Sequence, residues 1–192
     1  MNAVVWHVES MGGVMLLALP LWPLLRTLWL MVKKQSPRWG RELLLAGFVL
    51  YLIGLASQTL IGPSWRPEGM GLWDYAQSRW QQGWGINLEP GFTIRSMLEK
   101  GSRGQKLINL AGNVLIFLPL GFLPPLLWRC LRHWWAAIPL AAGVSCLIEY
   151  LQLFLGRSVD VDDVILNALG GLLGYMLFCL LPKGWKNKGG NP

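Results

Sequence analysis

Residues 107–128 read LINLAGNVLIFLPLGFLPPLLW, and no charged side chain interrupts them. A helix needs about 20 predominantly apolar residues to cross the hydrocarbon core of a bilayer, so this stretch predicts a transmembrane helix. Its amide side chains, Asn109 and Asn113, lie four residues apart and therefore on one face of that helix. The stretch thus predicts both a membrane span and a polar stripe along its first turns.

The composition of the whole chain agrees with a membrane protein. Of its 192 residues, 53% are hydrophobic and only 14% are charged, whereas a soluble domain carries about 25% charged residues. The mean hydropathy is +0.40. These values exclude a soluble enzyme, a disordered chain and a simple nucleic-acid binder, because too few polar side chains remain to cover a soluble surface. We interpret the net charge of +7 as basic loops beside a membrane.

Apolar stretches of similar length recur along the chain. They predict an all-α integral membrane protein, a bundle of about five transmembrane helices at residues 11–32, 43–61, 107–128, 134–155 and 164–181. The first span is the weakest, because Pro20, Pro23 and Arg26 interrupt it. Arg26 lies about 9 Å from the end of this span, so its side chain can extend towards the headgroups.

Basic residues in the short loops predict the orientation of the bundle. They follow the first span, separate the third from the fourth, and follow the fifth: Lys33, Lys34, Arg38, Arg41, Arg129, Arg132, Lys183, Lys186 and Lys188. In a five-span bundle these positions share one side, which the positive-inside rule makes cytoplasmic. We therefore expect the N-terminus outside and the C-terminus in the cytoplasm.

The spans divide the chain into three parts. Residues 1–42 form an N-terminal helix and a basic cytoplasmic loop, residues 43–182 a transmembrane domain, and residues 183–192 a basic cytoplasmic tail. Within the domain, residues 62–106 form the one sizeable extracytoplasmic segment. Residues 72–82 of this segment are either a short amphipathic helix at the membrane surface or an irregular loop with tryptophan anchors.

Polar side chains at membrane depth are the main functional signal. A charged group at the centre of a membrane helix costs about 2.5–3.5 kcal/mol, so such groups tend to face a protein interior or a wet cavity. In the third, fourth and fifth spans they fall within about 10 Å of the outer ends. We predict a ligand-binding pocket open to the outer face and lined by Asn109, Asn113, Glu149, Gln152, Arg157, Asp160, Asp163 and Asn167.

Several of these polar residues also have a purely structural interpretation. Asp160 and Asp162 could cap the last helix or face solvent, because acidic side chains favour a helix N-terminus. The two asparagines of the third span could form interhelical hydrogen bonds, and Arg157 could neutralise a neighbouring acid. Glu149 lies within an apolar helix, which favours a functional or tightly paired role over exposure to lipid.

Small residues have structural interpretations as well. The glycines within residues 170–174 allow neighbouring helices to approach closely. The three cysteines, Cys130, Cys146 and Cys179, have no CxxC spacing. We expect them to be small buried hydrophobic side chains rather than disulfide partners or metal ligands.

Two motifs resemble the signatures of the VanZ-like family. The first is NLAGNVLIFLPLGFLP at residues 109–124, and the second combines SCLIEYLQ at 145–152, RSVDVDD at 157–163 and NALGGLLGY at 167–175. Weaker matches precede them, and together they cover roughly residues 45–178. The family is named for a membrane protein that raises resistance to the antibiotic teicoplanin. The resemblance implies a multi-pass protein of the bacterial cytoplasmic (inner) membrane with an envelope role, and it implies no established catalytic residue.

Three functions remain open. The preferred one is a non-catalytic protein whose outer pocket binds an envelope lipid, a glycan precursor or a glycopeptide antibiotic, with Arg157 as the partner of an anion. The next is a scaffold for other membrane proteins. The third is an enzyme acting on a lipid-linked substrate, with Glu149 as a base and Asp160 or Asp163 on a divalent metal. The expected partners are the bilayer, such a ligand and membrane proteins, with no nucleic acid and no resident cofactor.

Overall fold

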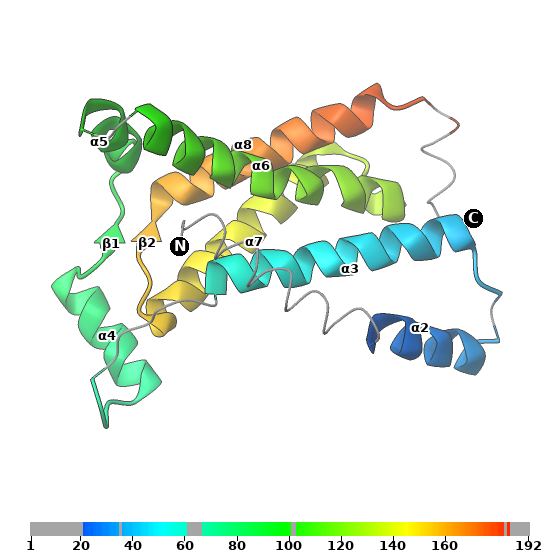
Figure 1. Cartoon of the computed structure of the whole chain (residues 1–192), viewed down its shortest axis with the longest axis horizontal. Coiled ribbons are helices and arrows are strands. Elements are labelled where there is room, and N and C mark those ends of the chain that lie inside the picture. The colour runs from blue at the N-terminus through cyan, green and yellow to red at the C-terminus, as the bar shows by residue number, and fades with distance from the viewer. Residues whose placement is uncertain (1–20, 35, 61–66, 101–102, 183, 185–192) are drawn as a thin grey trace.

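The computed structural model describes residues 21–34, 36–60, 67–100, 103–182 and 184 (Figure 1). Most of the predicted span 11–32 lies outside these residues, and only its last part is seen, as helix α2 (Leu21–Val32). The guanidinium of Arg26 in α2 donates two hydrogen bonds to the carboxylate of Glu42, at 2.6 and 2.9 Å. This ion pair joins α2 to the next helix, so Arg26 has a protein partner.

Four described helices are long and apolar enough to cross a membrane. They are α3 (Trp39–Leu60), the Leu110–Leu127 part of α6 (Arg103–Leu127), α7 (Trp134–Leu155) and α8 (Val161–Leu180). They correspond to the four predicted spans from residue 43 onward, and α7 has the predicted bounds. The predicted total of about five spans and the predicted orientation stay predictions, because the first span is largely outside the described residues. The predicted boundary between residues 42 and 43 falls within α3.

The segment between α3 and α6 folds against one end of the bundle (Figure 1). It contains α4 (Leu72–Gln82), β1 (Ile86–Asn87) and α5 (Phe92–Lys100). Strand β1 pairs in parallel with β2 (Val159–Asp160), which precedes α8. Residues 72–82 form a helix, as one of the two alternatives predicted, and its place at the membrane surface stays a prediction. The connection from α2 to α3 lies at the opposite end of the bundle (Figure 1), as does the short 3₁₀ turn η1 (Arg129–Leu131) after α6.

Glycines bring the backbones of α6 and α8 together. A Cβ atom on Gly170 or Gly174 would collide with the carbonyl oxygen of Val114 or Leu118 in α6. On the α6 side, a Cβ on Gly121 would collide with the backbone of Gly171. The close helix approach predicted for the glycine stripe is confirmed, because only a residue without a side chain fits at these contacts.

The expectation of buried cysteines is wrong. Cys130, Cys146 and Cys179 are all exposed and none forms a disulfide. Cys146 lies on α7 and Cys179 on α8. On a membrane-spanning helix an exposed position faces lipid, and an apolar thiol is compatible with that environment. Apolar surroundings in the sequence therefore did not distinguish a core position from a lipid-facing one.

Candidate functional site

A cavity of about 310 Å³ lies among the four spanning helices. Its walls come from the C-terminal turns of α3 and α7 and from the N-terminal halves of α6 and α8, which meet at the end of the bundle that carries β1 and β2 (Figure 1). The residues that line it are Gln58, Thr59, Gly112, Asn113, Ile116, Phe117, Ile148, Glu149, Gln152, Arg157, Asp163 and Asn167. The cavity is thus a mainly polar space in an apolar bundle.

Six of the eight predicted site residues line this cavity: Asn113, Glu149, Gln152, Arg157, Asp163 and Asn167. Asp160 does not line it. Asn109 belongs to α6, but its side chain lies outside the described residues. The cavity also contains two residues that the prediction did not include, Gln58 and Thr59 at the end of α3.

The two acids of the cavity, the buried Glu149 and the half-buried Asp163, each accept a hydrogen bond on one carboxylate oxygen. The backbone N–H of Asp160 donates to Oε2 of Glu149 at 2.8 Å. The side-chain amide of Asn113 donates to Oδ1 of Asp163 at 2.5 Å. Each acid is therefore oriented by a partner on another part of the chain.

The amide side chains of the cavity join helices to one another. Gln152 of α7 donates to the backbone oxygen of Thr59 in α3 at 2.9 Å. Asn167 of α8 donates through Nδ2 to Oγ of Ser145 in α7 at 2.8 Å. These contacts agree with an interhelical role for amides, and they fix the positions of the groups that face the cavity.

Asp160 and Asp162 bond to residues of the segment from β1 to α5 instead of lining the cavity. The carboxylate of Asp160 caps α8 by accepting from the N–H of Asp162 at 2.9 Å, and it also accepts from Asn87 and Thr93. Asp162 is completely buried, and its two oxygens accept the N–H groups of Gly91 and Ile94 at 2.5 and 3.0 Å. The capping interpretation is right for Asp160, whereas a solvated Asp162 is not observed.

Arg79 is a buried residue that the sequence interpretation missed. Its side chain is 4% exposed and donates to the carbonyls of Gln152 and Leu153 in the last turn of α7, and to that of Arg157 just beyond it. The Leu153 carbonyl is one of those that a helix C-terminus leaves without an intrahelical partner. Helical spacing places Arg79 on the same face as Tyr75, but the sequence does not show that this face is buried, so no local signal identified Arg79.

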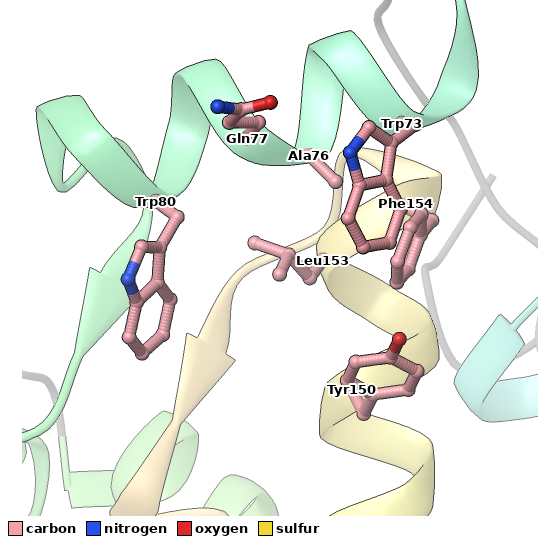
Figure 2. Close-up of a pocket in the computed structure, with 7 residues that line it drawn as sticks. All are labelled: Trp73, Ala76, Gln77, Trp80, Tyr150, Leu153 and Phe154. Atoms are coloured by element: carbon pink, nitrogen blue, oxygen red, sulfur yellow. The ribbon is translucent and has the colours of Figure 1, made fainter.

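A second, apolar cavity of about 210 Å³ lies between α4 and α7 (Figure 2). It is lined by Trp73, Ala76, Gln77, Trp80, Tyr150, Leu153 and Phe154. The ring of Phe154 lies 5.9 Å from that of Trp73 and 5.1 Å from that of Tyr150. Aromatic side chains of this kind favour the boundary between lipid and water, so this face of α4 is compatible with the membrane surface.

The described residues contain no group of three or more His, Cys, Asp or Glu side chains that could hold a metal ion. The carboxylate of Asp160, one of the metal ligands in the enzyme hypothesis, is bonded to Asn87, Thr93 and the Asp162 N–H. Glu149 and Asp163 are the two acids that remain in the cavity. The arrangement can offer a ligand acceptor oxygens from these two acids, together with the guanidinium of Arg157.

Comparison with known proteins gives one match. The model of the family described as VanZ/LLP1 matches residues 48–182, which is more than half of the chain and includes every residue that lines the polar cavity. No curated protein and no solved structure matches the chain.

Proposed function

Because the chain belongs to the VanZ/LLP1 family, as its motifs predicted, we propose that it is a bacterial cytoplasmic-membrane protein that binds an envelope lipid or glycan precursor. The polar cavity is the binding site, and the protein acts by binding rather than by catalysis. The observation that carries the proposal is the convergence of six polar side chains from α6, α7, α8 and the loop after α7 on one cavity. Polar groups at this depth are expensive unless they face a wet or ligand-filled space.

The orientation is part of the proposal. The basic residues of the α2–α3 connection and of η1 lie at the end of the bundle opposite the cavity. The positive-inside rule then assigns the cavity, α4 and α5 to the extracytoplasmic side. A ligand from the outer leaflet would reach the cavity from that side.

Cysteine labelling tests this orientation. Ser158 and Ser36 are both exposed and lie at opposite ends of the bundle. In a background without Cys130, Cys146 and Cys179, a membrane-impermeant maleimide added to intact cells should label Ser158→Cys and leave Ser36→Cys unlabelled until the membrane is opened. Labelling of the second variant alone would overturn the orientation.

The site is tested by substitutions that keep its shape. Glu149→Gln and Asp163→Asn can each keep the hydrogen bond that the wild-type carboxylate accepts. We expect both variants to fold in normal yield in detergent and to lose the envelope phenotype of the host, such as teicoplanin tolerance. Glu99→Gln, an exposed change in α5, is the matched control. Loss of folded protein in both variants, with normal phenotype per folded molecule, would overturn the binding site.

A scaffold role is the second candidate, and one observation favours it. The amides of Asn113, Gln152 and Asn167 all bond to other parts of the protein, which is what interhelical connections require. If this were the whole function, the two acid substitutions would change stability, and no ligand binding would be detected in the wild type or in either variant. Co-purification of a membrane partner that persists in both variants would support the scaffold.

A further inference from the structure

One atom in the wall of the polar cavity lacks the partner that its burial requires. Asn167 is 5% exposed, and Nδ2 of its amide is bonded to Ser145. Within the described part of the chain, Oδ1 of the same amide has no hydrogen-bond partner. Nearly all buried polar atoms in proteins are bonded, so this acceptor is open to a donor that the described residues do not supply, and its residue lines the cavity.

The two acids of the cavity add acceptors of the same kind. Each of Glu149 and Asp163 accepts one protein hydrogen bond, and an ionised carboxylate can accept on both oxygens. The second oxygen of each carboxylate can therefore accept a further hydrogen bond. The cavity therefore presents three acceptors, from Glu149, Asp163 and Asn167, on walls formed by α7 and α8.

The groups that line the cavity suit a hydroxyl better than a phosphate or an ammonium group. A phosphate would lie beside two carboxylates with one lining guanidinium, that of Arg157, to offset them, and like charges at short range repel. An ammonium group donates hydrogen bonds but cannot accept one from Arg157. A hydroxyl group donates to a carboxylate or amide oxygen and also accepts from a guanidinium. A ligand with several hydroxyls can therefore bond both to the acceptors and to the donor that line the cavity.

We propose that the cavity binds the hydroxyl groups of an uncharged sugar, which donate to Glu149, Asp163 and Asn167 and accept from Arg157. This inference rests on the proposed function, since it assigns a ligand class to the same cavity. The volume of about 310 Å³ limits the bound part to a small unit such as one sugar ring. The sugar is either the headgroup of a glycolipid or free, and the experiment distinguishes these sources.

The test compares ligands that differ in the headgroup alone. The full chain is purified in a detergent without sugar and is mixed with monoglucosyl-diacylglycerol or with phosphatidic acid of the same acyl chains, or with free glucose. Binding is measured by native mass spectrometry and by the shift in the midpoint of thermal unfolding. We expect the glucosyl lipid to bind at least about tenfold more tightly than phosphatidic acid. Binding of free glucose with equal affinity would assign the site to a soluble sugar.

Two variants test whether the glucosyl lipid binds in the polar cavity. Asp163→Asn and Glu149→Gln keep the protein hydrogen bond and replace the second acceptor oxygen by an NH₂ donor. Each should weaken binding of the glucosyl lipid by about tenfold, the loss expected for one hydrogen bond to a charged group. Glu99→Gln should bind like the wild type. The comparison of ligands uses the unaltered chain, so it decides the inference even where a variant does not fold.

The outcomes separate this inference from the proposed function. Tighter binding of phosphatidic acid than of both sugar ligands, with the same sensitivity to Glu149→Gln, would overturn the hydroxyl inference and leave the cavity as a binding site. Absence of binding by all three ligands, or binding that neither cavity variant changes, would overturn both.

Discussion

The two halves of α8 meet their neighbours in opposite ways. The first turns carry Asp163 and Asn167, whose side chains bond to Asn113 of α6 and Ser145 of α7. Further along, Gly170 and Gly174 place the backbone of α8 directly against α6. Hydrogen-bonded side chains thus connect α8 to its neighbours at the end where the cavity lies, and direct backbone contacts connect it to α6 further along. The difference shows that one helix can provide both a tight contact and the wall of a cavity.

The largest effect is expected in the glycine half. In Gly121→Ala the new Cβ would meet backbone atoms of Gly171, which cannot move without shifting α8. We expect a loss of about 3 kcal/mol, at the upper end of the range for overpacking. It is measured as a fall in the midpoint of thermal unfolding in detergent. Gly143→Ala makes the same change in α7 where nothing lies within 4 Å, and equal stability of the two variants would contradict the close contact.

The next effect concerns the polar half of the same helix. In Asp162→Asn one oxygen is replaced by an NH₂ group that faces a backbone N–H, of Gly91 or of Ile94. An unsatisfied buried donor costs about 2 kcal/mol. Hydrogen exchange should rise in residues 86–100 more than in the glycine-packed part of α8. Asp74→Asn, at an exposed position in α4, is the control. Unchanged protection of residues 86–100 would show that Asp162 does not hold this segment.

A smaller effect is expected where α4 meets α7. Arg79→Gln removes the guanidinium that donates to the carbonyls of Gln152, Leu153 and Arg157 at the end of α7. Because water can replace part of these contacts, we expect a loss of about 1.5 kcal/mol. Hydrogen exchange would rise mainly at residues 153–157, next to the cavity. Arg95→Gln removes an exposed arginine of α5 and should leave these residues protected, whereas a global rise in exchange would argue against a local role.

The smallest effect is expected where α3 meets α6. The hydroxyl of Tyr51 in α3 donates to the backbone oxygen of Ile116 in α6 at 2.8 Å. Tyr51→Phe removes this bond and keeps the ring, so we expect a loss of about 1 kcal/mol. The change should appear in the thermal midpoint and not in the affinity for the glucosyl lipid. Tyr150→Phe, which alters an exposed hydroxyl, is the control.

Much of the fold could be predicted, because insertion depends on length and apolarity. The helix Trp134–Leu155 has its predicted bounds, and Gly156, in the left-handed conformation with φ 73°, ends it. Helix α6 begins at Arg103, before the predicted start, since hydropathy marks the part within the membrane and not the end of the helix. The first span could not be compared, because residues 11–20 are outside the described residues.

The cavity residues were predictable for a different reason. Polar side chains such as Glu149 and Asn167 are costly at membrane depth, so their presence alone marks them. Arg79 and Asp162 carry no such mark. They act through carbonyls and N–H groups that lie about 70 residues away in the sequence, and no local pattern reveals a contact of that range. The exposure of the cysteines was not predicted, because hydropathy does not distinguish a lipid-facing position from a position in the protein core.

The parallel pairing of β1 with β2 has a consequence for the order of assembly. Asn87 and Asp160 are 73 residues apart, and the whole of α6 and α7 lies between them. Translation adds about 5–20 residues per second, so β1 leaves the ribosome about 4–15 seconds before its partner strand is made. During that interval the segment from α4 to α5 has no strand to pair with and no Asp162 to hold it. It can reach its final position only after α7, β2 and the first turn of α8 have been made, which makes this segment a late reporter of biogenesis.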